Sequence, residues 1–114
     1  IIAIDVHTEG LEKPLETVVE TILYRVIQEA VNNTIKHARA TQLDISLYNQ
    51  PEGITLLIED NGIGFNKANL EKEGQGMQNM KSRIAFLHGT IHWESSPGNG
   101  TLLSINIPAK NEKK

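Results

Sequence analysis

The stretch QEAVNNTIKHA, residues 28–38, closes the longest helical pattern in the chain and contains its clearest exception. From about Leu15 to Ala38, apolar side chains recur at the three- and four-residue spacing of one buried helical face. At about 100° per residue, Glu29, Asn33 and Lys36 fall within roughly 60° of one another, and Asn33 points along the apolar face. The sequence therefore predicts a long helix with an amide and a carboxylate in or beside its buried side. The apolar face comprises Val19, Ile22, Leu23, Val26, Ile27, Ala30 and Thr34.

These polar side chains need a partner, because burying an unpaired amide costs roughly 1–3 kcal/mol and an unpaired carboxylate costs more. A Mg²⁺ ion with a polyphosphate would supply one, since Mg²⁺ prefers oxygen ligands and Lys36 would add positive charge for a phosphate. A solvated helix edge with an internal hydrogen bond between Glu29 and Asn33 is the commoner arrangement at such spacing. His37 is typical of a helix end as much as of a binding site. The helix alone leaves both interpretations open.

The rest of the chain alternates short strands with one further helix. Gly89 follows this second helix, at the position of a C-cap glycine. The order of elements predicts an α/β two-layer sandwich, in which helices cover one face of a mixed, mostly antiparallel sheet. We expect residues 1–114 to be a single domain from a longer protein. Strands are expected at 1–6, 41–48, 54–59, 90–94 and 102–107, the second helix at 77–87, and loops or turns at 7–14, 51–53, 60–76 and 97–100.

Three glycine clusters punctuate the second half of the chain. Residues 60–65 read DNGIGF directly after a strand, where an aspartate can accept a hydrogen bond from an exocyclic amine and glycines let the backbone approach a flat base. Residues 74–77 read GQGM at a helix start, where free N–H groups favour anions. Residues 98–101 read GNGT. Each cluster alone is equally typical of a turn or a flexible loop, and their order is the stronger signal.

Taken in order, these pieces resemble the four nucleotide-binding boxes of the ATP-binding (Bergerat) fold shared by histidine kinases, type II topoisomerase ATPase domains, Hsp90 and MutL. QEAVNNTIKHA resembles the N box, and DNGIGF resembles the first glycine box. GQGMQNMKSRI (residues 74–84) resembles the second box, and SSPGNGT (residues 95–101) the closing box. The forms EAxNNxxKH and GMxNMxxRI are most similar to sensor histidine kinases related to nitrate and membrane-fluidity sensors.

The resemblance implies a set of residues around the phosphates of ATP. Asn33 would coordinate a Mg²⁺ ion that bridges the phosphates, and Glu29 would hold the water shell of the metal or act as a general base. Lys36 would contact phosphate, and His37 would flank the nucleotide. ATP and Mg²⁺ are therefore the implied cofactors, with Glu29, Asn33 and Lys36 as the catalytic set.

The resemblance also implies a set of residues around the base and beneath a glycine-rich lid. Asp60 would bond the adenine amino group, and Thr101 would support the same contact through water. Met77 would complete the nucleotide-binding set. The glycines implied are Gly62 and Gly64, which would make room for the base, and Gly74 and Gly76, which would hinge the lid and approach the phosphates.

Two departures from the family pattern limit what the chain can do alone. The phenylalanine-rich box of many histidine kinases is missing, with only Phe65 in that interval. The four histidines do not lie in the helical H-[DE] context of a phosphoacceptor. The resemblance therefore implies the catalytic half of a two-component kinase, which phosphorylates a histidine on separate dimerisation helices and thence a response-regulator receiver domain. Alternatives are an anti-sigma-factor-type serine kinase, a nucleotide-gated interaction module, and a structural domain that binds nothing.

Composition narrows the partners and the compartment. A net charge of −3 without a long basic run argues against a nucleic-acid interface. The absence of cysteine excludes disulfides and thiolate metal sites. No apolar run approaches the roughly 20 residues that a membrane-spanning helix needs. We expect a cytoplasmic domain, monomeric in isolation, within a homodimeric parent for which a membrane anchor is plausible by resemblance.

Overall fold

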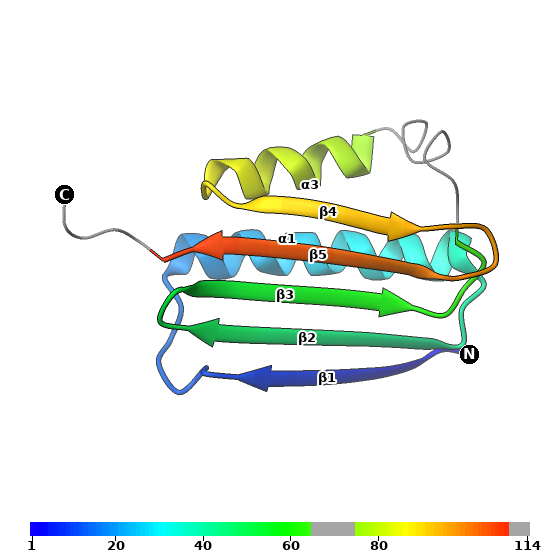
Figure 1. Ribbon diagram of the computed structural model, residues 1–114, viewed down its shortest axis with the longest axis horizontal. Helices are drawn as coiled ribbons and strands as arrows, with labels where there is room; N and C mark the ends of the chain where they lie inside the picture. Colours follow the sequence, from blue (N-terminus) through cyan, green and yellow to red (C-terminus); the bar gives the residue numbers. More distant parts are fainter. Residues whose placement is uncertain (65–74, 110–114) are drawn as a thin grey trace.

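The computed structural model describes residues 1–64 and 75–109, with every side chain in these ranges except those of residues 37, 38, 75 and 76. Five strands form one sheet in the order β1-β2-β3-β5-β4 (Figure 1). Strand β1 is parallel to β2, and the other neighbours are antiparallel. The predicted mixed, mostly antiparallel sheet is confirmed. The elements are β1 (Ala3–Glu9), α1 (Thr17–Asn33), the π-helical turn η1 (Thr34–Ala38), β2 (Gln42–Gln50), β3 (Gly53–Asp60), α3 (Gln75–Phe86), β4 (Thr90–Ser95) and β5 (Thr101–Pro108).

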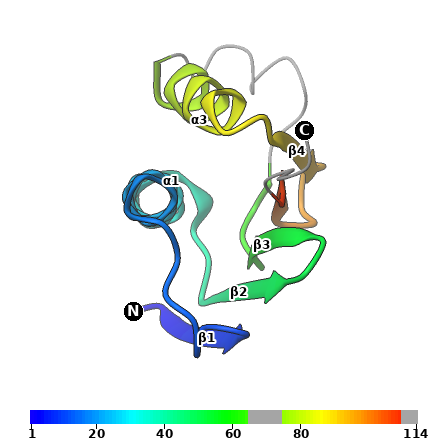
Figure 2. The same ribbon diagram turned by 90° about the vertical axis from the view of Figure 1, so that its left-hand side faces the viewer.

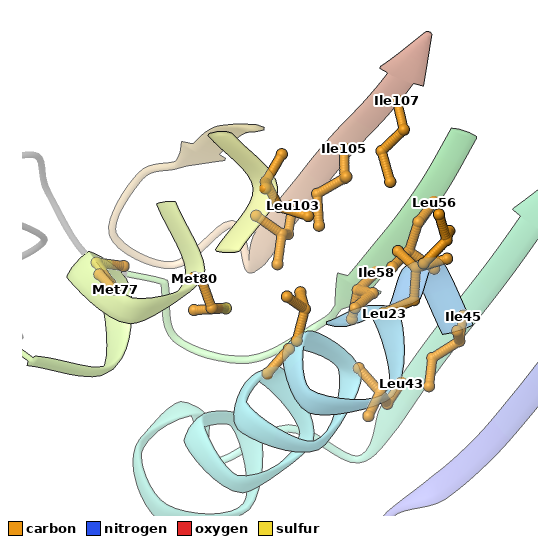
Figure 3. Packing of buried hydrophobic residues seen from close by; sticks show 14 residues of the cluster. Leu23, Leu43, Ile45, Leu56, Ile58, Met77, Met80, Leu103, Ile105 and Ile107 are labelled. Carbon is orange, nitrogen blue, oxygen red and sulfur yellow. The ribbon is translucent and has the colours of Figure 1, made fainter. Parts of the chain in front are cut away.

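Both α-helices lie on the same face of the sheet, which makes the two layers visible end-on (Figure 2). Leu23 from α1, Met80 from α3 and Ile105 from β5 point into the space between the layers (Figure 3). The predicted two-layer sandwich is therefore confirmed. Neither α1 nor α3, the α-helices of the described part of the chain, is long and apolar enough to cross a membrane.

Helix α1 buries the face that its sequence predicts. Val19, Leu23, Val26 and Ala30 are buried at successive steps of three or four residues, and Thr34 continues the line at 5% exposure. The helix begins at Thr17, two residues after the expected start, with the Glu20 N–H bonded to the Glu16 carbonyl. The apolar stripe fixes which side of α1 faces the sheet, and so which side carries Thr34 inward.

The end of α1 departs from the prediction of one continuous α-helix to Ala38. From Thr34 the backbone forms a π-helical turn, which ends where Arg39 adopts a left-handed φ of 52°. A π turn is wider than an α turn, so each residue advances by less than 100°. The calculation that places Lys36 on the same side of the helix as Glu29 and Asn33 is therefore wrong. It uses the α-helical angle per residue for the residues after Asn33, which form a π-helical turn.

Strand β1 is longer than expected. It continues through Glu9, which pairs with Tyr48, so the predicted loop at 7–14 begins only at Gly10. All seven residues of the strand are exposed. The alternation of Ile4 and Val6 with polar residues stops at Val6, because His7, Thr8 and Glu9 are all polar, and pairing with the long β2 extends the strand through them.

At the end of α3, His88 and not Gly89 takes the conformation that the sequence predicts for a C-cap glycine. His88 takes the left-handed conformation, with φ of 61°, while the Gly89 N–H bonds to the Ile84 carbonyl at 3.0 Å. This is a Schellman arrangement with histidine at the position that glycine usually occupies. Gly89 is needed for a different reason: a Cβ there would lie 2.6 Å from the Asn106 carbonyl oxygen of β5.

Candidate functional site

Three strands meet near the C-terminal end of α1, at the right of Figure 1: β3 and β4 end there, and β5 begins there. Asp60 closes β3 and pairs with Thr101, the first residue of β5, which pairs in turn with Ser95 at the end of β4. Directly paired residues of antiparallel strands lie on the same face of a sheet. This row shares its face with the buried Ile58 and Leu103, so its polar side chains point toward the helices.

Asp60 is half-buried and accepts hydrogen bonds from three separate parts of the chain. The Gly62 N–H donates to its Oδ1 at 2.8 Å, and the Thr34 hydroxyl and the Thr101 backbone N–H also donate to the carboxylate. Burial raises the pKa of Asp60 above its usual value of 3.8, against the lowering effect of these hydrogen bonds. A carboxylate oriented this way is an acceptor at the end of an otherwise apolar layer, suited to an N–H donor of a ligand.

The loop after β3 and the turn between β4 and β5 lie against one another through glycines. A Cβ on Gly64 would lie 2.2 Å from the Ser96 carbonyl oxygen, and one on Gly100 would lie 2.2 Å from the Asp60 carbonyl oxygen. Both glycines have positive φ, 66° and 73°. The Gly98 N–H donates to the Ile63 carbonyl at 2.5 Å across the same contact. Two of the predicted glycine clusters are thus brought together beside Asp60, where their backbones would meet a ligand.

Glu29 and Asn33 lie near the C-terminal end of α1, and Lys36 lies in η1. Glu29 and Asn33 are both partly exposed, and Lys36 is exposed. No hydrogen bond joins Glu29 to Asn33 within the described ranges, so the internally bonded helix edge is not what the side chains form. Thr34, next to Asn33, bonds Asp60 and therefore ties this end of the helix to the end of the sheet.

The donor set of Glu29 and Asn33 fits a Mg²⁺ ion that is shared with a polyphosphate. Mg²⁺ in nucleotide enzymes is held by one or two protein oxygens together with phosphate oxygens and water. An amide oxygen and a carboxylate one helical turn apart match that chemistry. Among the described side chains no group of three or more His, Cys, Asp or Glu is arranged to hold a metal ion without a ligand.

The remaining predicted residues lie in the core, at the start of α3 or outside the described residues. Met77 is 6% exposed and packs in the core near the start of α3, so packing accounts for it without a ligand. Gly76 is the second residue of α3. Phe65 and Gly74 lie outside the described residues, as does the side chain of His37.

Three residues that the sequence does not single out as site residues also shape this end of the sheet. Thr34 reads as one more member of the apolar helix face, yet its hydroxyl bonds Asp60. Ser95 donates to the Gly100 carbonyl at 2.8 Å and contacts the Thr101 hydroxyl at 3.0 Å. Asn61 accepts backbone N–H bonds from Thr41 and Gln42 at 2.9 and 3.0 Å, which ties the end of β3 to the start of β2.

Sequence comparison connects this geometry to known proteins. The family described as "Histidine kinase-, DNA gyrase B-, and HSP90-like ATPase" matches residues 18–111. Sensor protein VraS of Staphylococcus saprophyticus is 36% identical over 94 residues, which cover 82% of this chain and 27% of that protein. VraS of Staphylococcus aureus is 34% identical over 94 residues, with the same two coverages. The chain thus spans about a quarter of the length of these curated relatives.

Structure comparison gives the same assignment. The ATP-binding domain of PrrB from Mycobacterium tuberculosis aligns with a TM-score of 0.66 at 26% identity, over 80% of this chain and 69% of that one. The histidine kinase domain of the blue-light-activated kinase EL346 from Erythrobacter litoralis aligns with a TM-score of 0.77 at 20% identity, over 93% and 55%. This second likeness bears on the fold alone. The chain belongs to the histidine kinase-, DNA gyrase B- and HSP90-like ATPase family, as a catalytic ATP-binding domain of the histidine kinase type.

Proposed function

We propose that this domain binds Mg-ATP at the polar end of its sheet and donates the γ-phosphoryl group to a histidine on a separate dimerisation domain. The observation that carries the proposal is Asp60, a half-buried carboxylate held by three donors from η1, the loop after β3, and β5. Desolvating a carboxylate costs free energy, and a fold that binds no ligand at this end has nothing to offset that cost. A purine amino group satisfies its remaining acceptor capacity.

The base would lie against Asp60, which accepts a hydrogen bond from the exocyclic amine of adenine. Thr101 is the neighbouring polar side chain in the same row and would support this contact. Gly62 is buried and Gly64 closely approaches Ser96, so the loop presents bare backbone where a flat base can stack. Gly74 and Gly76 would hinge the lid and approach the phosphates.

The phosphates would extend toward the end of α1. Asn33 and Glu29 would hold a Mg²⁺ ion, with Lys36 and His37 contacting phosphate or flanking the nucleotide. The metal, when bound, would neutralise charge on the phosphoryl oxygens. Phosphoryl transfer depends mainly on positioning and on charge neutralisation, and the residues here supply both. Glu29 would orient water at the metal or accept a proton.

The remainder of the reaction belongs to the parent protein. Because the chain spans about a quarter of its curated relatives, the dimerisation helices, the phosphoacceptor histidine and the response-regulator partner are assigned to the parent by resemblance. The parent would be a homodimer with this domain in the cytoplasm, and a membrane anchor would lie in another part of it. The nitrate-sensor and membrane-fluidity-sensor subgroup stays a prediction.

The test is a calorimetric titration of ATP into the purified chain, with and without Mg²⁺. A hydrogen bond to a charged group contributes roughly 1.5–3 kcal/mol, so Asp60→Asn should weaken ATP binding by about tenfold or more. Asn33→Ala should mainly remove the Mg²⁺ dependence. Asp44→Asn on the exposed face of β2 and Asn32→Ala on the exposed side of α1 are the matched controls, and neither should change affinity.

Two results would contradict the proposal. A folded wild-type chain that shows no saturable ATP binding would remove it outright. Equal losses in Asp60→Asn and Asp44→Asn would show that the affinity follows general charge and not the carboxylate at the end of β3.

A further inference from the structure

We propose that Thr34 and Asn61 are positioning residues, which clamp the segment between α1 and β2 onto the end of β3 and so hold the phosphate side of the nucleotide site in place. The inference rests on the proposed function and deepens it, because it makes the phosphate part of the ATP affinity depend on two side chains outside the implied contacts. The clamped segment, residues 34–41, comprises η1 and the three residues before β2. It carries Lys36, the residue proposed to contact phosphate.

Thr34 holds the first end of the segment. It is 5% exposed, and no other polar or charged residue of the described ranges 1–64 and 75–109 is buried. Its backbone N–H donates to the carbonyls of Ala30 and Val31, which continues the hydrogen bonding of α1. Its hydroxyl donates to the carboxylate of Asp60. Thr34 therefore joins the last turn of α1 to the end of β3.

Asn61 holds the second end. Its Oδ1 accepts the backbone N–H groups of Thr41 and Gln42 at 2.9 and 3.0 Å, and its Nδ2 donates to the Thr41 hydroxyl at 3.0 Å. The Asn61 N–H also donates to the Gln42 carbonyl at 3.3 Å. The two ends of the segment are thus bonded to Asp60 and Asn61, which are consecutive in the sequence.

Between these two anchors the backbone takes conformations that are uncommon in proteins. The segment begins as a π-helical turn, and Arg39, which ends that turn, has a left-handed φ of 52°. Such conformations persist only where the surrounding structure determines them, and they are frequent at functional sites. Figure 2 shows the segment passing from the helix layer to the sheet layer. We infer that the two anchors determine its path, and with it the position of Lys36.

The clamp joins the two parts of the proposed nucleotide site. Asp60 accepts the Thr34 hydroxyl and would also accept the base, so the residue that receives adenine also helps to hold the phosphate segment. Without the clamp, the segment would have to be ordered when the phosphates bind, and the entropy of ordering would weaken binding. Adenosine has no phosphates and does not require that ordering. The clamp should therefore strengthen the binding of ATP more than the binding of adenosine.

The test compares ATP with adenosine, both in the presence of Mg²⁺. Asn61→Ala releases Thr41 and keeps Asp60, so it should reduce the ratio of ATP to adenosine affinity by roughly three- to tenfold, mainly through weaker ATP binding. Calorimetry measures the binding of ATP, and a chemical-shift titration measures the weaker binding of adenosine. Asn106→Ala is the matched control, because it removes another exposed asparagine that is bonded to a threonine, Thr55, on the face of the sheet opposite the helices. It should leave the ratio unchanged.

Substitutions of Thr34 test the other anchor. Thr34→Val keeps the shape of the side chain and removes the donor, so it should reduce the ratio by a similar factor. Thr34→Ser keeps the donor and should retain most of the ratio. Thr55→Val, which removes the hydroxyl that bonds Asn106 at 3.0 Å, is the matched control. A loss of stability alone would not change the ratio, because both ligands bind the folded chain, and urea denaturation measures that loss separately.

Two results would overturn the inference while ATP binding stands. An unchanged ratio in Asn61→Ala or in Thr34→Val would mean that the segment keeps its position without that anchor. Equal reductions in Thr34→Val and Thr34→Ser would assign the effect to packing and not to the hydroxyl. Failure of the proposed function is a different observation, since a folded wild-type chain would then show no saturable binding of ATP.

Discussion

At both ends of the sheet glycines allow backbones to approach one another closely, but the side chains around them differ. At the far end, on the left of Figure 1, Gly10 and Gly53 have positive φ and approach carbonyl oxygens of neighbouring strands closely. At the end of the sheet that carries Asp60, Gly64 and Gly100 do the same. The far end, however, is a hollow with a mainly apolar lining that includes Leu15, Phe86, Leu87 and Ile107.

This difference shows which feature identifies a site. Close approach of backbones at a turn requires glycine wherever a sheet ends, so glycine alone marks geometry and not function. The Asp60 end of the sheet adds a half-buried carboxylate with the hydroxyl groups of Thr34 and Thr101 around it. Polar groups kept on the helix-covered face have a desolvation cost that packing does not explain. That cost is the evidence for a ligand.

The largest expected effect comes from a matched pair of glycine substitutions at the two ends. A Cβ would lie 2.2 Å from the Asp60 carbonyl oxygen in Gly100→Ala and 2.0 Å from the Asn49 carbonyl oxygen in Gly10→Ala, with φ of 73° and 83°. Each should lower the free energy of unfolding by roughly 1–3 kcal/mol or more, measured by urea denaturation. Only Gly100→Ala displaces Asp60, so it alone should also weaken ATP binding, by about tenfold.

Gly98→Ala is the control within the same turn as Gly100. The φ of Gly98 is 83°, the same as that of Gly10, but a Cβ added to Gly98 would meet nothing within 4 Å. It should cost only the left-handed conformation, about 1–2 kcal/mol, and leave affinity unchanged. Equal losses of ATP affinity in Gly10→Ala and Gly100→Ala would remove the distinction between the two ends.

A second, smaller effect concerns the pH dependence of stability. Because burial raises the pKa of Asp60 in the folded chain, the folded chain holds this proton more tightly than the unfolded chain. The resulting stabilisation is fully present below about pH 3.8 and is lost as the pH rises through the folded-state pKa. The melting temperature of the nucleotide-free wild type, relative to Asp60→Asn, should therefore rise as the pH is lowered toward that range. A difference that instead grows with increasing pH would mean that the hydrogen bonds outweigh burial.

The sequence predicts the layers of this fold better than the details at their ends. The burial stripe of α1 and the strand-like runs of β2, β3 and β5 are local patterns, and each predicts the correct element. The sequence predicts too early an end for β1, because residues 7–9 are polar and their place in the strand depends on pairing with β2. The π turn after Asn33 was missed because a fixed angle per residue cannot anticipate a change of helix type.

The residues of the candidate site also divide into those that the sequence predicts and those that it does not. Asp60 and Glu29 stand out from their own segments, since one follows a strand before glycines and the other interrupts an apolar helix face. Thr34 and Ser95 do not, because their roles depend on partners brought close by the fold. Thr34 contacts a carboxylate 26 positions away in the sequence, and from the sequence it is one more small residue on a buried face.

The smallest expected effect lies at the far end, where His88 occupies a left-handed position that usually holds glycine. Histidine tolerates this conformation better than most residues, yet it still carries a Cβ penalty of about 1 kcal/mol. His88→Gly should therefore raise the free energy of unfolding by up to about 1 kcal/mol, less the entropy that glycine adds to the unfolded chain. Urea denaturation measures the gain, and calorimetry should give an unchanged ATP affinity, because His88 lies at the opposite end of α3 from the nucleotide. His88→Ala, which keeps the Cβ, should show no gain. A change in ATP affinity in His88→Gly would mean that the two ends of the sheet are coupled through α3, and the separation of packing from recognition would then fail.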